Sequence, residues 1–288
     1  MATPTESYIV ANGIRHWTVT QGSGVPVILC HGGPGIYDYL EPVAHMIDDI
    51  ALVHRYDQRG CGRSGPATSY TVANHVADLD ALRAAWGHEK VIVAGHSWGA
   101  NLALAYSLAH PDRVSGLMYL AGYRSGVGSP DACRLAYDRA CEAKMTPHEL
   151  ERELYLNERR KVATGEELEA IHRERKEIND KTNLFDPKGP FKFPATDAFP
   201  INYEANALGG TSHKTVYSPE WMEGLLRLNV PALVLHPAGD PRPRWDSEAL
   251  ARIIRAKFVV LEKAGHDPWI EQPEALRAAL REFLTSIT

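Results

Sequence analysis

Short apolar runs alternate with amphipathic stretches along the first part of the chain. The run at 25–30 is apolar throughout, which is typical of a central strand buried on both faces. Runs of the same kind recur at 50–56, 91–94 and 117–120. Between them, 72–86 carries apolar residues at helical spacing, and 101–109 resembles a second helix that Pro111 ends. Alternating strands and helices predict a mostly parallel central sheet flanked by helices.

A hairpin signal precedes these elements. Asn12 and Gly13 stand between strand-like segments at 8–10 and 14–19. An Asn-Gly pair favours the two-residue turn that joins antiparallel strands, because both residues tolerate a positive φ. We therefore expect the sheet to begin with an antiparallel pair.

The stretch 123–228 is charged, helix-like and poor in strand signals. Thr146 and Glu149 have the spacing of a helix N-terminus with reciprocal side-chain caps, and Thr164 begins a similar pattern. Residues 182–210 are rich in Pro, Gly, Asn and Phe, a composition that predicts a loop.

The alternating pattern returns after this stretch. It predicts strands at 232–235 and 258–261 and helices at 247–254 and 273–284. We therefore predict one α/β core domain formed by 1–122 and 229–288, interrupted by a helical cap at 123–228.

Bulk properties exclude several classes of protein. The chain has 288 residues, of which 44% are hydrophobic and 23% charged, so it can bury a large core without disulfides. Its net charge of -5 lacks the basic footprint of a nucleic-acid-binding protein. No apolar run approaches the length of a membrane span, and the first residues show no signal peptide. The four cysteines are scattered, so we expect reduced thiols and a cytoplasmic location.

A nucleophile motif follows the strand-like run at 91–94. The segment 95–99 reads Gly95, His96, Ser97, Trp98, Gly99, which matches G-x-S-x-G between a strand and a helix. The pattern is typical of the α/β-hydrolase fold, where the serine occupies a sharp strand-to-helix turn. Ser97 is therefore the predicted nucleophile.

A serine hydroxyl needs a positioned base, and the chain order in this fold is serine, acid, histidine. Asp240 and His266 each follow a predicted strand, at the same edge of the sheet as Ser97. His31 and His96 are rival bases, and Asp267 is a rival acid next to His266. Because His96 adjoins the serine, we expect it to pack beside the turn.

Glycines after the run at 25–30 predict an oxyanion hole. In this fold the first strand-to-helix loop and the residue after the nucleophile each supply a backbone N–H, here Gly33 and Trp98. Residues 60–65 also match G-x-G-x-x-G, but no helix opens at the third glycine, so we expect no nucleotide cofactor. No metal-ligand spacing is present, so we expect no metal.

Three glycine-containing segments stand out together: His31-Gly32-Gly33-Pro34-Gly35, Asp57-Gln58-Arg59-Gly60-Cys61-Gly62-Arg63-Ser64 and Ser97-Trp98-Gly99. In combination they resemble the proline iminopeptidase family of α/β-hydrolases. The resemblance implies release of an N-terminal residue, preferably proline, without a cofactor and with the same triad. It departs at Ile36, at His96, where glycine is common, and at Leu120-Ala121-Gly122, where the family often has an arginine before glycine.

Substrate recognition is expected to lie in the cap. The family's cap glutamates hold the substrate amine, and Glu204 loosely resembles that element. Tyr123 and Tyr203 are candidate lining residues. The alternative is an esterase, lactonase or amidase that acts on a small metabolite. A third hypothesis is a non-catalytic receptor, and the presence of all three triad residues argues against it. The expected partner is a small peptide or small molecule, and the sequence leaves the oligomeric state open.

Overall fold

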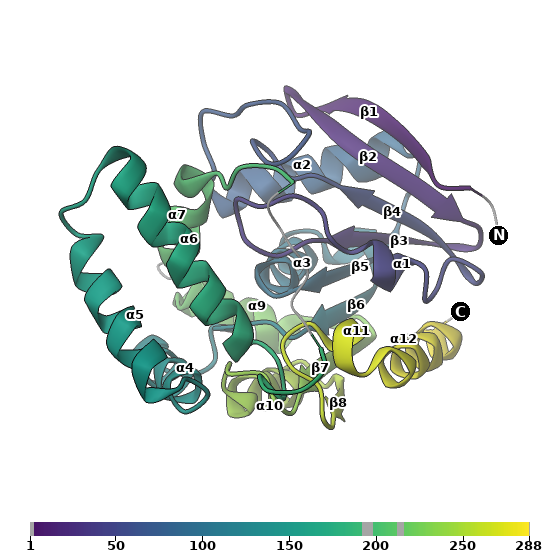
Figure 1. Cartoon of the computed structure of the whole chain (residues 1–288). Helices are drawn as coiled ribbons and strands as arrows, with labels where there is room; N and C mark the ends of the chain where they lie inside the picture. The colour runs from purple at the N-terminus through teal and green to yellow at the C-terminus, as the bar shows by residue number, and fades with distance from the viewer. Residues whose placement is uncertain (1–2, 192–197, 212–215, 288) are drawn as a thin grey trace.

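An eight-stranded sheet forms the centre of the molecule. The computed structural model describes residues 3–191, 198–211 and 216–287. The strand order is β1-β2-β4-β3-β5-β6-β7-β8, antiparallel at β1–β2 and β2–β4 and parallel elsewhere (Figure 1). The strands are β1 (Thr5–Ala11), β2 (Ile14–Gly22), β3 (Val25–Cys30), β4 (Ala51–Tyr56), β5 (Val91–His96), β6 (Val114–Leu120), β7 (Ala232–Pro237) and β8 (Lys257–Leu261). The predicted mostly parallel sheet is confirmed.

The predicted hairpin is also present. β1 and β2 pair antiparallel from Thr5 with Thr20 to Ala11 with Ile14. Asn12 and Gly13 both have positive φ, at 48° and 77°, as the tight hairpin turn requires.

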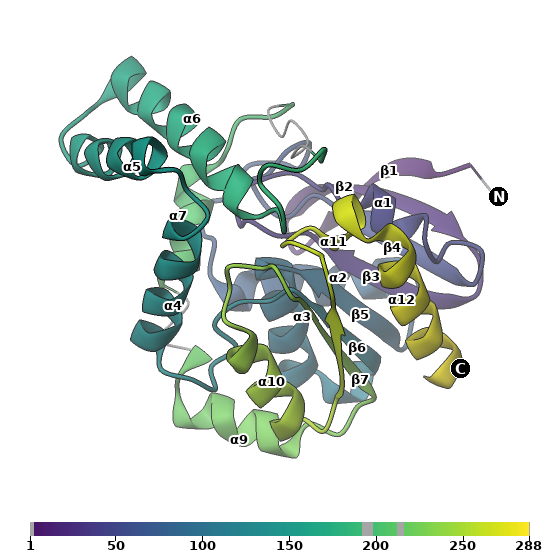
Figure 2. The same ribbon diagram turned by 60° about the horizontal axis from the view of Figure 1, so that its bottom comes forward.

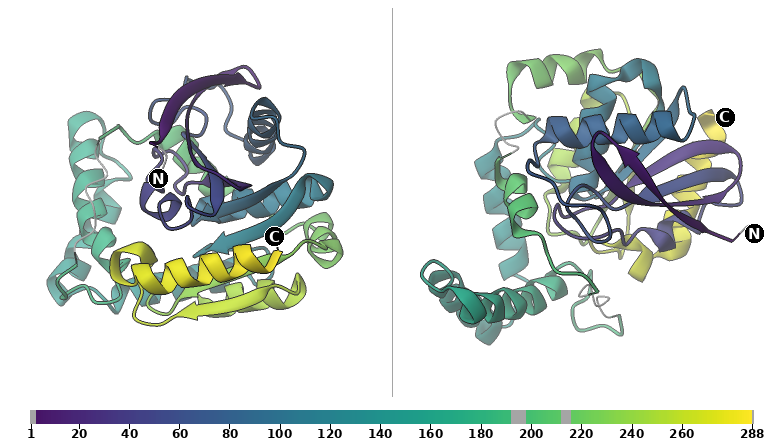
Figure 3. Two further views of the ribbon diagram at one scale, coloured as in Figure 1. Left: turned by 90° about the vertical axis from the view of Figure 1, so that its right-hand side faces the viewer. Right: turned by 90° about the horizontal axis from the view of Figure 1, so that it is seen from above.

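Helices cover both faces of the sheet, because the buried strands are apolar on both sides. In β5, Val91 and Val93 face one apolar cluster and Ile92 and Ala94 the other. The first cluster includes residues of α2 (Val72–Ala85), α3 (Trp98–Ala109), α9 (Pro219–Arg227) and α10 (Arg244–Ile253). The second includes α1 (Glu41–Ala44) and α12 (Pro273–Ile287), which runs along the sheet (Figure 3). The predicted helices at 72–86, 101–109, 247–254 and 273–284 all form, with ends shifted by a few residues.

A helical segment lies between β6 and β7. The described part of this segment forms α4 (Pro130–Glu142), α5 (Pro147–Arg159), α6 (Gly165–Thr182), α7 (Tyr203–Thr211) and α9. α5 and α6 pack together and stand out from the sheet (Figure 2). No strand occurs in the parts of 123–228 that the structure describes, and 192–197 and 212–215 lie outside those parts. The division into core and cap domains stays a prediction.

The two helix N-caps predicted from the sequence differ in the structure. Thr146 and Glu149 form both hydrogen bonds of the predicted reciprocal cap. Thr164 precedes α6 without a side-chain cap bond. The predicted loop at 182–210 was wrong at its end, since α7 begins at Tyr203. Asn202 accepts a hydrogen bond from the Ala205 amide at 3.0 Å, so it caps a helix that composition did not reveal.

Candidate active site

Ser97 lies on a strained turn between β5 and α3. Its φ of 58° and ψ of -123° fall in a region that side chains disfavour. The flanking glycines are required by crowding. A Cβ on Gly95 would lie 2.0 Å from the Gly99 carbonyl oxygen, and one on Gly99 would lie 2.1 Å from the Cys30 carbonyl oxygen. The motif therefore occupies the strand-to-helix turn that the sequence predicts.

Asp240 and His266 meet through a short hydrogen bond. Asp240 follows β7, His266 follows β8, and 2.7 Å separates His266 Nδ1 from Asp240 Oδ2. Asp240 Oδ1 accepts from the backbone N–H of Arg242 at 2.9 Å and from its Nη1 at 3.0 Å. A carboxylate can only accept, so His266 Nδ1 carries the proton and Nε2 is left to accept one.

Burial and the charge of Arg242 shift the pKa values of both Asp240 and His266. Burial opposes ionisation of Asp240, but the opposite charges of His266 and Arg242 outweigh it and hold the pKa of Asp240 well below its usual range. Burial, followed by the charge of Arg242, lowers the pKa of His266 to about 4, although Asp240 opposes this shift. At neutral pH the imidazole is therefore uncharged, as a general base must be.

One cavity of about 520 Å³ brings Ser97 and His266 together. No hydrogen bond joins these two side chains in the described structure, and such bonds are often long before substrate binds. Gly33 also lines the cavity, together with Trp17 from β2 and Lys176 from α6. Residues from the sheet side and from the inserted helices thus share the walls around Ser97.

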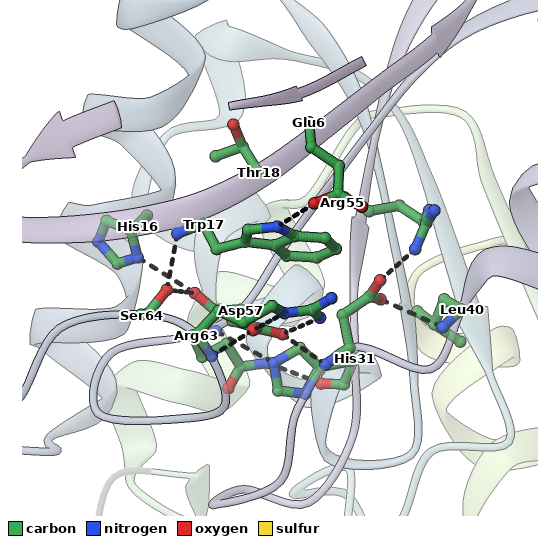
Figure 4. A network of polar contacts seen from close by, with 12 residues as sticks. Glu6, His16, Trp17, Thr18, His31, Leu40, Arg55, Asp57, Arg63 and Ser64 are labelled. Atoms are coloured by element: carbon green, nitrogen blue, oxygen red, sulfur yellow. Dashed lines mark hydrogen bonds and ion pairs between the residues drawn. The ribbon is translucent and has the colours of Figure 1, made fainter. Parts of the chain in front are cut away.

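Polar contacts hold the loop that carries Gly33, and Figure 4 shows those of His31, Asp57 and Arg63. His31 Nε2 accepts from the Gln58 amide at 3.1 Å, and Gln58 Nε2 donates to the His31 carbonyl at 2.7 Å. Asp57 accepts from the Asp38 amide at 2.7 Å and from Arg63 Nε at 2.7 Å. Residues 57–64 therefore brace the glycine loop.

The two residues predicted to form the oxyanion hole differ in backbone conformation and surroundings. Gly33 has a φ of 118°, which favours glycine. Trp98 is the first residue of α3, and its ring packs edge-on to His75 at 4.9 Å between centroids. Its backbone N–H, and not its side chain, is the part of Trp98 that would serve an oxyanion.

A second hydrogen-bonded chain links the three loops of the site, and sequence reasoning missed it. The Gly32 amide donates to the Tyr39 hydroxyl at 2.9 Å, and that hydroxyl lies 2.7 Å from His96 Nδ1. His96 Nε2 lies 2.8 Å from the His266 carbonyl oxygen. Since a carbonyl only accepts, Nε2 carries the proton, and Tyr39 donates to Nδ1. Burial, followed by the charge of His266, keeps the pKa of His96 well below its usual value, so the ring is neutral.

Removing the Tyr39 hydroxyl should lower kcat without weakening substrate binding. In Tyr39→Phe the Gly32 amide and His96 Nδ1 lose their partner, and small displacements of reacting groups are costly, so we expect kcat to fall about 10- to 100-fold. Steady-state kinetics would show the fall in kcat with KM nearly unchanged. Tyr8→Phe, an exposed tyrosine on β1, is the control. An unchanged kcat in Tyr39→Phe would contradict a positioning role.

The three predicted cap residues do not reach the cavity that holds Ser97. Glu204 and Tyr203 are exposed on α7, and the Tyr203 ring packs against His172 at 4.5 Å. Tyr123 packs against Tyr137 at 5.4 Å, and its buried hydroxyl has no hydrogen-bond partner among the described residues. None of the three lines that cavity, so their part in substrate binding stays a prediction that the cavity does not support. α6 lines the cavity through Lys176 and Asp180, whereas the start of α7 contacts the glycine loop, where Asn206 Nδ2 donates to the Pro34 carbonyl at 2.9 Å.

Within residues 3–191, 198–211 and 216–287, no group of three or more His, Cys, Asp or Glu side chains is arranged to hold a metal ion. In the same residues no helix has the length and apolarity needed to cross a bilayer.

Comparisons with known sequences identify relatives. The model of the alpha/beta hydrolase fold family matches residues 25–273. A proline iminopeptidase of Heyndrickxia coagulans is 28% identical over 280 residues, covering 92% of each chain. A proline iminopeptidase of Neisseria gonorrhoeae is 45% identical over 98 residues, which is 33% of this chain and 32% of that relative. The stronger local match therefore spans only about a third of either protein.

Solved structures give the same fold at low identity. VinJ superposes with a TM-score of 0.74 at 22% identity, covering 99% of both chains. The proline iminopeptidase of Mycobacterium smegmatis superposes with a TM-score of 0.68 at 20% identity, covering 98% of both. An esterase of Thermogutta terrifontis reaches 0.65 at 24% identity, covering 98% of this chain and 99% of that one. Together with the match to the family model, this architecture shows that the chain belongs to the α/β-hydrolase fold family and resembles its proline iminopeptidases.

Proposed function

We propose that the protein is a serine hydrolase that works through an acyl-enzyme. His266 removes the proton from Ser97 as Oγ attacks a carbonyl carbon, and the Gly33 and Trp98 amides stabilise the oxyanion. His266 then protonates the leaving group, and water releases the acyl group by the reverse steps. Asp240 holds His266 in the required tautomer and stabilises its charged form.

The observation that carries this proposal is the 2.7 Å contact between His266 Nδ1 and Asp240 Oδ2 beside the cavity that Ser97 lines. The uncharged state of His266 and the strained turn at Ser97 add to it. Each feature serves nucleophilic catalysis, and none is needed for packing alone.

For the substrate, we propose the N-terminal residue of a peptide, with proline or another small residue preferred. The whole-chain relative from Heyndrickxia coagulans and the local match to the Neisseria protein support this class. Hydrolysis of a small ester, lactone or amide is the second candidate. It is favoured by the position of Glu204, which lies outside the cavity and so does not supply the amine contact expected from the cap.

Three chromogenic substrates separate these candidates. Proline p-nitroanilide, its N-acetyl derivative and p-nitrophenyl acetate would be compared at equal enzyme concentration. Much faster cleavage of the free-amine anilide supports the peptidase, whereas cleavage of the ester alone supports the second candidate. Labelling with a fluorophosphonate, followed by peptide mass spectrometry, should place the adduct on Ser97. An adduct elsewhere would contradict the mechanism.

We also propose that the protein is located in the cytoplasm and that 123–228 forms a cap domain. All four cysteines are free and buried, which fits a reducing compartment. The proposed cap, 123–228, contributes Lys176, Asp180 and Asn183 to the cavity, so it would shape the substrate site.

On the acidic side of the pH profile, kcat/KM should fall only at a pH well below the usual pKa range of histidine. His266 must be neutral to act as a base, and it becomes protonated as pH falls through its pKa of about 4. We therefore expect kcat/KM to be maintained from pH 7 to about 5 and to fall near pH 4. The measurement uses p-nitrophenyl acetate, which does not titrate, with reactivation at pH 7 as the control for unfolding. A midpoint near 6.5 would contradict the lowered pKa.

A further inference from the structure

Asp267 is a buried acid in the cavity that the proposed mechanism does not use. It directly follows His266, lines the same cavity as Ser97 and is 7% exposed. Its Oδ2 is buried and has no hydrogen-bond partner among the described residues. Asp267 precedes the short helix α11 (Pro268–Glu271), but its side chain does not cap that helix. An unpaired buried carboxylate is unfavourable, so Asp267 would be stabilised by a hydrogen-bond donor that the described protein does not supply.

Other acids that line the cavity already have partners. Asp180 forms an ion pair with Lys176, Asp38 forms one with Arg55, and Glu6 accepts from Trp17 Nε1 at 3.0 Å. Glu41 lies 3.6 Å from His45. Each of these four acids thus has a polar partner within the protein, and Asp267 differs from them.

The protein offsets a negative charge on Asp267 only in part. No Lys, Arg or His of the described chain lies within ion-pair distance of its carboxylate, and Arg242 is paired with Asp240 at 3.0 Å. Burial raises the pKa of Asp267 to about 7. Arg242 opposes this shift, while the negative charges of Asp240, Asp180 and Glu271 add to it. A cation that brings its own N–H donors would satisfy both the charge and the open oxygen.

We propose that Asp267 is a specificity-determining residue that binds the ammonium group of a substrate whose amine is next to the carbonyl attacked by Ser97. The inference rests on the proposed function and assigns its amine contact to the loop of the base, not to Glu204. An α-amine is two bonds from the carbonyl carbon, and Asp267 is one residue from the base that serves that carbon. A carboxylate here would therefore select aminoacyl substrates over acylated or uncharged ones.

The test compares Asp267→Asn with wild type on three substrates. For proline p-nitroanilide we expect KM to rise about 10- to 100-fold, the scale of a lost charged hydrogen bond. Hydrolysis of p-nitrophenyl acetate, which has no amine, should stay within about twofold, and any cleavage of N-acetylproline p-nitroanilide should be equally unaffected. Glu204→Gln, on the exposed surface of α7, is the matched control and should change nothing. Because Asn removes an unpaired buried charge without changing size, the Tm should not fall; Asp267→Ser is the second variant if Asn fails to fold.

A binding measurement keeps the test decisive if neither anilide is cleaved. Calorimetry on Ser97→Ala should show prolinamide binding more tightly than N-acetylprolinamide, and Asp267→Asn in that background should abolish the difference. The assignment to Asp267 would be overturned if Asp267→Asn left the ratio of the two affinities unchanged, or if Glu204→Gln abolished that ratio instead. It would also be overturned if Asp267→Asn impaired ester hydrolysis as much as anilide hydrolysis. Full activity of Ser97→Ala would instead overturn the proposed function, so the two failures can be told apart.

Discussion

Ser97→Ala should lower kcat by at least about 10⁴-fold, because it removes the only atom that can form the proposed acyl-enzyme. The turn at Ser97 is built by Gly95 and Gly99 and not by the hydroxyl, so the fold should be retained. The measurement is kcat on whichever of the three chromogenic substrates the wild type cleaves, with the Tm recorded in parallel.

Ser23→Ala provides the matched control for this result. Ser23 is exposed between β2 and β3, far in sequence from the turn, so its loss should change neither kcat nor Tm. If Ser97→Ala retained wild-type activity, the nucleophile would have to be another group, and the proposed mechanism would be wrong.

The second large effect is expected from Asp240→Asn. An amide at this position can present N–H to His266 Nδ1 and so favours the tautomer that places the proton on Nε2, where the base must accept one. Loss of the carboxylate also removes the charge that stabilises protonated His266 and removes the ion-pair partner of Arg242. Together these changes should lower kcat by about 10⁴-fold.

Asp267→Asn distinguishes the two acids near His266. Only Asp240 contacts the imidazole, at 2.7 Å, so only its replacement should abolish hydrolysis of p-nitrophenyl acetate. The two variants would be compared by kcat on that ester at pH 7. Normal turnover in Asp240→Asn together with loss in Asp267→Asn would reverse the assignment of the acid.

The contacts of His96 give a physical reason for a histidine at this position. A glycine at this position could not join Tyr39 to the carbonyl of His266, which are connected here through the two nitrogens of one neutral ring. The departure from the usual family residue thus coincides with a contact between the glycine loop and the loop of the base. Tyr39→Phe tests one end of that contact.

Local patterns in the sequence were sufficient for much of the fold. The apolar runs that became β3 and β5 are buried on both faces, so their hydrophobicity is visible without knowing their neighbours. Asn12-Gly13 and the Thr146 cap depend on residues close in sequence, and both formed as expected. The nucleophile turn belongs to the same class, because crowding at Gly95 and Gly99 restricts which residues can stand there.

Only the tertiary structure decided which side chains surround the cavity. Tyr39, His96 and His266 are far apart along the chain, and their contacts arise because parallel strands end at one edge of the sheet. Whether a carboxylate is paired also depends on distant residues, so nothing local separates Asp267 from Glu204. Their burial does: Glu204 is solvated on α7, while Asp267 is enclosed without a partner. The sequence determined the elements and the predicted catalytic positions, and packing between distant segments determined which side chains line the cavity at Ser97.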